Sequence, residues 1–156
     1  MIRIVVPGPP PRKNSRAAVA YLTPATTLAW YSGLAIAVHR SLHANIPERL
    51  AKTGRWSVVI AVYEEKLRHL DDGTSVPLGD VDSTVSAVLD GLQPKRCGAW
   101  APLDDDARVV RLFVEKHYDP DAPRVEITLE QLPPLHIEPR KTHRRKPAPR
   151  PKRKTP

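Results

Sequence analysis

Residues 79–92 read GDVDSTVSAVLDGL, and this stretch predicts the helix on which the fold depends. Four apolar residues recur in it at the spacing of one helix face: Val85, Val88, Leu89 and Leu92. That face is expected to pack on the core. Asp82 lies three residues before Val85, so the same pattern turns its carboxylate inward at the start of the helix. Because a buried ionised carboxylate is costly unless it is paired, the pattern predicts a partner for Asp82.

The segments on both sides of this helix predict a sheet and a second helix. Apolar alternation predicts strands over 2–6, 55–65, 107–118 and 124–132. A helix is expected to begin at Pro24, with Thr23 as its cap, and to end within 43–45. Its inward residues are predicted to be Leu28, Tyr31, Leu34, Ala35, Val38 and Leu42.

The order of these segments, β-α-β-α-β-β, predicts an α+β domain over 1–134, with a mixed sheet of about four strands and two packed helices. Strand 55–65 is apolar on both faces, which favours a central strand covered on both sides. Strands 107–118 and 124–132 are expected to form a hairpin across the loop between them. Segments 66–79 and 93–106 are rich in turn residues and are expected to be loops.

Composition and cysteine usage indicate a soluble globular protein. Hydrophobic residues make up 40% of the 156 and charged residues 27%, which is typical of one globular domain. The single cysteine, Cys97, excludes an intramolecular disulfide and gives no second thiolate for a zinc site. No apolar run reaches the roughly 20 residues that span a membrane, and the N-terminal run is too short for a signal peptide. We therefore expect a cytoplasmic protein without a membrane partner.

The net positive charge is concentrated in the last residues of the chain. Nine lysines and arginines but one acid follow His136, whereas the residues before it carry 16 of each sign. Repeated prolines and like charges predict a disordered tail over 135–156. Such an arm is typical of a nonspecific nucleic-acid contact, and a solubility tail or a binder of an acidic partner is the alternative. The residues expected to contact DNA come from three basic segments: Arg12, Lys13, Asn14, Arg16, Lys95, Arg96, Arg144, Arg145, Lys146, Lys152, Arg153 and Lys154.

Acidic residues gather at two places, Asp80 with Asp82 and the run 104–106. In a purely structural interpretation, one of Asp80, Asp82 and Ser83 is the N-cap of the helix, because a side-chain oxygen there accepts free amide hydrogens. A cap needs only one such residue, however, and acids from separate elements repel one another unless a cation lies among them. Mg²⁺ prefers hard oxygen ligands of this kind. The pattern therefore predicts Mg²⁺ as the cofactor.

Two motifs resemble one family of nucleases. GDVDSTVSAVLDGL followed by LDDDARV resembles the D-x-D-N-x-x-K-x-x-x-D-x-L … D-D-x-x-V pattern of the RusA-like Holliday junction resolvases, a group common in phages and prophages. The stretch PGPPPRKNSR at 7–16 resembles the proline-rich turn and basic segment that follow the first strand in that family. The resemblance covers 2–132. It implies a Mg²⁺-dependent homodimeric endodeoxyribonuclease that cuts four-way DNA junctions during recombination and repair, in a bacterial or phage-infected cell.

Carried over residue by residue, the resemblance implies that Asp80, Asp82 and Asp106 are the catalytic metal ligands, with Asp105 beside them. Asp90 matches an acid within the family's helix and is either a supporting residue or a solvated helix position. Ser86 stands where the family has a lysine, which would steady the scissile phosphate or the attacking water. A cation from Arg12, Lys13, Lys95 or Arg96 is the expected replacement.

Three other functions fit the same residues. A DNA-binding protein of the same fold that has lost catalysis would account for Ser86. A metal-dependent nuclease that cuts flaps or forks would use the same acids. An interaction protein whose basic arm binds an acidic partner would need no metal.

Removal of the residues after His136 is expected to weaken DNA binding by roughly tenfold or more and to leave the metal site intact, because the tail carries the whole net positive charge. The slope of log K against log salt concentration is expected to become shallower in the same variant. Fluorescence anisotropy with labelled DNA over a range of salt concentrations measures both. An unchanged affinity and slope would contradict the tail's role.

Overall fold

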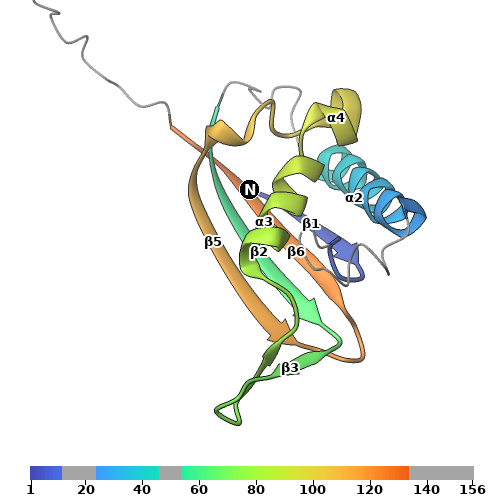
Figure 1. Ribbon diagram of the computed structural model, residues 1–156. Helices are drawn as coiled ribbons and strands as arrows, with labels where there is room; N and C mark the ends of the chain where they lie inside the picture. The colour runs from blue at the N-terminus through green and yellow to red at the C-terminus, as the bar shows by residue number, and fades with distance from the viewer. Residues whose placement is uncertain (12–23, 46–53, 134–156) are drawn as a thin grey trace, which may run out of the picture.

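The computed structural model describes residues 1–11, 24–45 and 54–133 (Figure 1). The predicted DNA contacts Arg12, Lys13, Asn14 and Arg16, the predicted cap Thr23 and the tail over 135–156 lie outside these residues.

A mixed four-stranded sheet forms the centre of the fold. Its strands are β1 (Ile2–Pro7), β2 (Arg55–Glu64), β5 (Val109–Tyr118) and β6 (Arg124–Leu132), in the order β1-β6-β2-β5. Strand β6 runs antiparallel to both β1 and β2, whereas β5 runs parallel to β2. The predicted α+β class and the mixed sheet are thus confirmed.

The predicted hairpin of the last two strands is wrong, because β5 and β6 lie on opposite sides of β2. Helix α3 (Val81–Gly91) connects the end of β2 with the start of β5, so β5 runs parallel to β2. The turn after β5 then crosses the end of β2, where the amide of Asp119 donates to the carbonyl of Glu64 at 2.9 Å. Strand β6 returns on the far side of β2 as its antiparallel neighbour.

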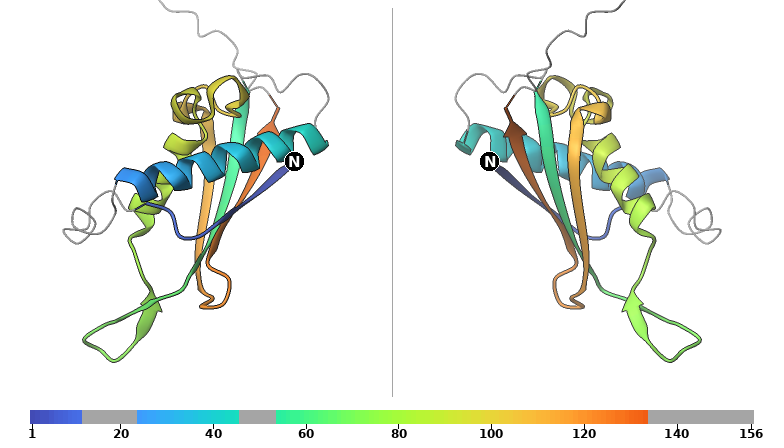
Figure 2. Two further views of the ribbon diagram at one scale, coloured as in Figure 1. Left: turned by 90° about the vertical axis from the view of Figure 1, so that its right-hand side faces the viewer. Right: turned by 90° about the vertical axis from the view of Figure 1, so that its left-hand side faces the viewer.

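Helices cover one face of the sheet, although both faces of β2 were expected to be covered. Helix α2 (Pro24–Asn45) runs across the sheet (Figure 2), and α3 passes in front of it (Figure 1). The inward side chains of β2 are fully buried at Trp56, Val58, Ile60 and Val62. On the opposite face Val59 is 36% exposed. Within the described residues, no second layer of helices or strands covers that face of β2. Its apolar residues were therefore a misleading signal.

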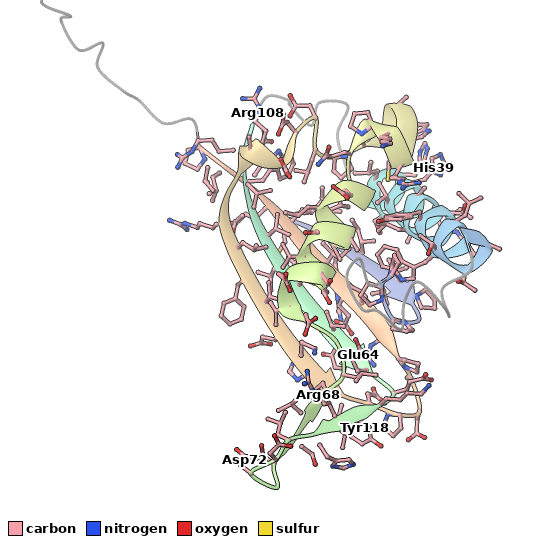
Figure 3. All side chains as sticks on the ribbon, viewed as in Figure 1. His39, Glu64, Arg68, Asp72, Arg108 and Tyr118 are labelled. Carbon is pink, nitrogen blue, oxygen red and sulfur yellow. The ribbon has the colours of Figure 1, made fainter. Side chains whose placement is uncertain are left out.

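The two segments expected to be loops contain short regular elements. Strands β3 (Leu67–His69) and β4 (Ser75–Pro77) form a hairpin that extends beyond the main sheet, with Asp72 near its tip (Figure 3). After α3 come the short helix α4 (Pro94–Cys97) and two 3₁₀ turns, η1 (Gly98–Trp100) and η2 (Asp106–Arg108). Neither segment has a long periodic pattern, which is why sequence analysis missed them.

Helix α2 contacts the core through Trp30, Tyr31, Leu34 and Val38, all of which are buried. The predicted inward positions are confirmed except for Leu28, which is 60% exposed in the second turn of the helix. The indole nitrogen of Trp30 donates to the carbonyl of Gly8 at 3.4 Å, which ties the helix to the end of β1.

The lone cysteine lies at the contact between α3 and α4. The Cys97 thiol is buried and donates to the carbonyl of Gly91 at 2.9 Å. Burial raises its pKa to about 11. Cys97 is therefore a packing residue that fixes α4 against the end of α3.

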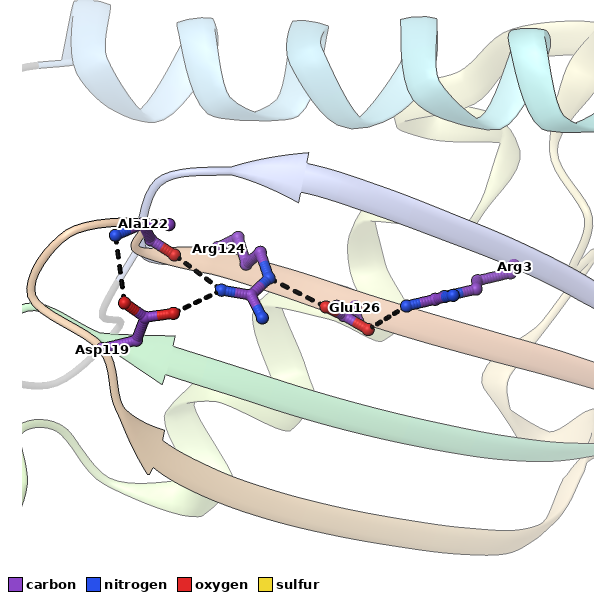
Figure 4. Close-up of polar contacts among 5 residues, drawn as sticks. All are labelled: Arg3, Asp119, Ala122, Arg124 and Glu126. Atoms are coloured by element: carbon purple, nitrogen blue, oxygen red, sulfur yellow. Dashed lines mark hydrogen bonds and ion pairs between the residues drawn. The ribbon is translucent and has the colours of Figure 1, made fainter.

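Charged side chains occupy the end of the open sheet face (Figure 4). Arg124 of β6 pairs with Asp119 at 2.7 Å and with Glu126 at 2.8 Å, and Glu126 also pairs with Arg3 of β1 at 2.7 Å. The hydrogen bond from Arg124, reinforced by Arg3, lowers the pKa of Glu126. This network makes the β1–β6 side of the open face polar.

No helix of the described residues is long and apolar enough to cross a membrane.

Gly91 is expected to be intolerant of a side chain because α3 approaches α2 closely there. A methyl group at Gly91 would overlap Cδ2 of the buried Leu34 and lie 3.3 Å from the Tyr31 ring. We expect Gly91→Ala to lower the free energy of unfolding by about 1–3 kcal/mol. Gly33→Ala is the control, since a methyl group there meets no atom within 4 Å. It should raise stability by about 0.4–1 kcal/mol, and urea unfolding of both variants tests the pair.

Candidate functional site

The first turn of α3 lies at the end of the sheet where the parallel strands β2 and β5 end. Ligands of sheets with parallel strands commonly bind there, because the loops that follow the strands converge on a helix N-terminus. Near the end of β5, the ammonium of Lys116 donates to the carbonyls of Pro77 (2.7 Å) and Gly79 (2.5 Å). Lys116 therefore fixes the turn that leads into Asp80.

Asp80 is the N-cap residue of α3 by position, but its carboxylate does not cap the helix. Its backbone carbonyl accepts hydrogen bonds from the amide of Thr84 at 3.2 Å and from the Thr84 hydroxyl at 3.1 Å. The Asp80 side chain makes no cap hydrogen bond. The carboxylate is exposed and remains available for a ligand.

Asp82 is exposed and does not face inward as predicted, although Val88, Leu89 and Leu92 of the expected core face are buried. The buried face of α3 is wider than expected. Its buried positions include the small residues Ser83, Thr84, Ala87 and Gly91. These residues let the helix approach the core closely and turn Asp82 toward solvent. The Asp82 carboxylate is therefore not desolvated and needs no cation to offset burial. Within the described residues, neither Asp80 nor Asp82 has an ion pair.

Glu64 is the buried acid that sequence analysis missed. It is 1% exposed at the end of β2, on the face that α3 covers. Lys116 lies diagonally opposite on that face, because Val62 pairs with Lys116 and Glu64 with Tyr118. The alternation from Trp56 to Glu64 contained the signal, since every second residue of that strand points inward.

A cavity of about 390 Å³ opens beside the first turn of α3. Its lining includes Arg68 of β3, Asp80, Val81 and Lys116. The Arg68 side chain is exposed and has no hydrogen bond or ion pair with another described residue. A guanidinium in this setting can bind a phosphate through two parallel hydrogen bonds. Figure 3 shows Glu64 and Arg68 in the same part of the molecule.

Two acids of the second group, over 104–106, have structural roles. Asp105 caps η2, since its Oδ1 accepts from the amide of Ala107 at 2.8 Å. That hydrogen bond lowers the pKa of Asp105. Asp104 pairs with Arg108 at 3.3 Å, and Asp106 is exposed.

The two acidic groups lie at opposite ends of α3. The amide of Leu103 donates to the carbonyl of Leu92 at 3.3 Å, which places the 104–106 run beyond the C-terminal end of the helix. A helix of this length extends about 16 Å. Figure 3 shows Arg108 far from Glu64 and Arg68, in agreement. Asp106 therefore does not join Asp80 and Asp82 within one chain.

The other predicted site residues among those described lie along α3 or beyond its C-terminal end. Asp90, Lys95 and Arg96 are at the C-terminal end of α3 or in α4, so neither cation lies beside Asp80 in the first turn of α3. Ser86 is half-buried in the middle of the helix. The described residues instead bring Arg68 and Lys116 to the first turn of α3, and both come from segments with no motif.

Mg²⁺ is compatible with the pair Asp80 and Asp82. Magnesium is commonly bound by one or two carboxylates, with water and substrate phosphates completing its shell. The exposed carboxylate of Asp80 lines the cavity with the free guanidinium of Arg68, and that of Asp82 lies exposed in the same first turn, so one or two carboxylates are available there. A group of three or more acidic, histidine or cysteine side chains able to hold a metal is absent from residues 1–11, 24–45 and 54–133.

Comparison with known proteins assigns no family. Neither a family model nor a curated protein matches the chain. The resemblance to RusA-like resolvases therefore rests on the stretch at 7–16 and on the motifs around Asp80, Asp82 and the 104–106 run.

Lys116→Met is expected to release the turn that precedes α3. Methionine keeps the length of the side chain but loses both hydrogen bonds to the carbonyls, which should lower the free energy of unfolding by about 1–3 kcal/mol. Hydrogen exchange within 77–82 should become faster, as measured by mass spectrometry. Lys66→Met is the control, because Lys66 is exposed and its ion pair with Glu65 spans 3.5 Å. Equal exchange in both variants would contradict this role of Lys116.

Proposed function

We propose that the protein is a Mg²⁺-dependent endodeoxyribonuclease that resolves four-way DNA junctions by paired cuts. The main support is the unengaged carboxylate of Asp80, which lines a cavity together with the free guanidinium of Arg68, and the exposed carboxylate of Asp82 two residues further along. The resemblance of the motifs to RusA-like resolvases and the positive charge of the tail support DNA as the substrate.

Each residue of the site has a proposed part. Asp80 and Asp82 would hold Mg²⁺, which when bound activates water and neutralises charge on a phosphate. Arg68 would bind the non-bridging oxygens of the scissile phosphate and so take the place of the family lysine, which is Ser86 here. Lys116 positions the turn before Asp80 through its hydrogen bonds to two carbonyls.

Two copies of the chain are part of the proposal. A four-way junction is close to two-fold symmetric, and resolving it takes two paired cuts. One site per chain in a two-fold homodimer supplies both.

A DNA-binding protein of the same fold that does not cleave, or that acts on flaps or forks, is the second candidate. The position of Asp106 at the far end of α3 favours it, because a third carboxylate does not reach Asp80 and Asp82 within one chain. Ser86 also favours the second candidate, because the lysine of the RusA-like pattern is absent at this position.

Cleavage of a synthetic mobile four-way junction tests the proposal. Symmetric nicks are expected with Mg²⁺ and not with EDTA, and linear duplex should remain intact. Asp82→Asn should slow cleavage by at least about 100-fold, because it removes a charged ligand. Junction binding should persist in that variant.

The matched control for this experiment is Asp71→Asn. Asp71 is an exposed aspartate in the turn of the β3–β4 hairpin, outside the cavity lining. Junction binding without cleavage in any divalent metal would favour the second candidate. Cleavage of flaps or forks in preference to junctions would favour the form of the second candidate that acts on flaps or forks.

A further inference from the structure

Two histidines face one another on the last two turns of α2. His39 and His43 are four residues apart, so their side chains are neighbours on the helix surface. Their Nε2 atoms are 2.9 Å apart, and their ring centroids are 4.2 Å apart. His43 is exposed and His39 is half-buried, so solvent reaches the pair. Figure 3 shows His39 on α2 near α4, away from Glu64 and Arg68, which separates the pair from the site at the first turn of α3.

The indole ring of Trp100 packs against both imidazoles. Trp100 is the last residue of η1, and its ring centroid lies 4.5 Å from that of His39 and 4.9 Å from that of His43. The contact with His39 is edge-on, with 87° between the two ring planes. Side chains that are already held by a neighbour lose less conformational freedom when they bind a ligand. The two imidazoles are therefore preorganised.

The short distance between the two Nε2 atoms fits a metal chelate as well as a hydrogen bond. Without a metal, one ring donates its Nε2–H and the other accepts through its lone pair. An ion bound by both nitrogens at about 2.0–2.1 Å, with an angle of about 90–109° between them, places the nitrogens about 2.8–3.4 Å apart. The observed 2.9 Å lies within that range. A shift of the donated proton to Nδ1 of the same ring gives both lone pairs to the ion without net loss of a proton.

We propose that His39 and His43 together bind a divalent transition-metal ion of the class of Cu²⁺, Ni²⁺ and Zn²⁺ through their Nε2 atoms. Imidazole nitrogen suits these ions, whereas Mg²⁺ prefers oxygen ligands. In the part of the chain that the structure describes, no third acidic, histidine or cysteine side chain joins the pair. The ion therefore keeps water in its remaining positions.

A bound ion would join the last two turns of α2 to each other. Both Nε2 atoms reach one ion only while the backbone between them is helical, because the spacing of four residues brings the rings together only in a helix. An ion that binds the folded chain in preference to the unfolded chain raises its stability. The melting temperature of the full chain is therefore expected to rise with Cu²⁺, and the rise should be smaller without either histidine.

Titration of the full chain with Cu²⁺ in an excess of Mg²⁺ tests the site without DNA. The excess Mg²⁺ competes for carboxylates such as Asp80 and leaves imidazoles free. Calorimetry should show that His39→Asn and His43→Asn each weaken the tightest Cu²⁺ site by at least about tenfold, because each variant loses one of two nitrogen ligands. Electron paramagnetic resonance with less than one equivalent of Cu²⁺ should show two coordinated imidazoles in the wild-type chain and one in either variant.

Two control variants separate the facing pair from histidine content alone. His69→Asn removes an exposed histidine of β3, whose Nδ1 lies 2.8 Å from the hydroxyl oxygen of Ser75, and should leave the affinity unchanged. His43→Asn combined with Arg40→His keeps the number of histidines but places two at adjacent positions, which do not face one another on a helix. This double variant should bind Cu²⁺ as weakly as His43→Asn alone.

Equal Cu²⁺ affinity in the wild-type chain and in both single variants would overturn the proposal. A single coordinated imidazole in the wild-type chain would overturn it as well, and so would tight binding by the double variant. The titration involves neither DNA nor cleavage, so failure of the proposed nuclease function would leave this result unaffected.

Discussion

Strand β2 is hydrogen-bonded to β6 on one side and to β5 on the other, and its inward residues from Trp56 to Val62 are fully buried. The parallel pairing with β5 requires a connection that returns to the start of β2, and α3 supplies it. This constraint sets the N-terminus of α3 beside the ends of both strands. It also sets the C-terminus of α3 beside the start of β5, so the two acidic groups flanking the helix are kept apart.

The contact of α3 with α2 depends on small residues. Gly91 allows Leu34 and Tyr31 to approach the helix backbone, and Ser83, Thr84 and Ala87 continue the same buried surface toward the first turn. A helix held by small residues lies closer to its neighbours than one held by leucine or valine. The cost of this close packing is that Val81 and Asp82 lie exposed to solvent, and that exposure makes the Asp82 carboxylate accessible to a ligand.

Much of the fold could be predicted from local patterns, and the errors have physical causes. The strands at 55–65 and 124–132 and the helix beginning at Pro24 follow clear periodicity, and each is confirmed within one or two residues. Pairing is not local, so the placement of β5 and β6 on opposite sides of β2 could not be read from their short separation in sequence. The exposure of Asp82 was missed because the prediction counted large apolar residues only and left out the buried Ser83 and Thr84. Asp80 and Asp82 carried a motif, whereas Arg68 and Lys116 reach the site through tertiary structure alone.

The burial of Cys97 has a practical consequence for chemical labelling. A thiol with a pKa of about 11, inside the contact between α3 and α4, is almost entirely protonated at neutral pH and closed to reagents. The chain contains no other cysteine. A cysteine introduced on the surface would therefore be the sole reactive thiol of the folded protein, and a fluorophore or spin label would attach at that position without removal of the native residue.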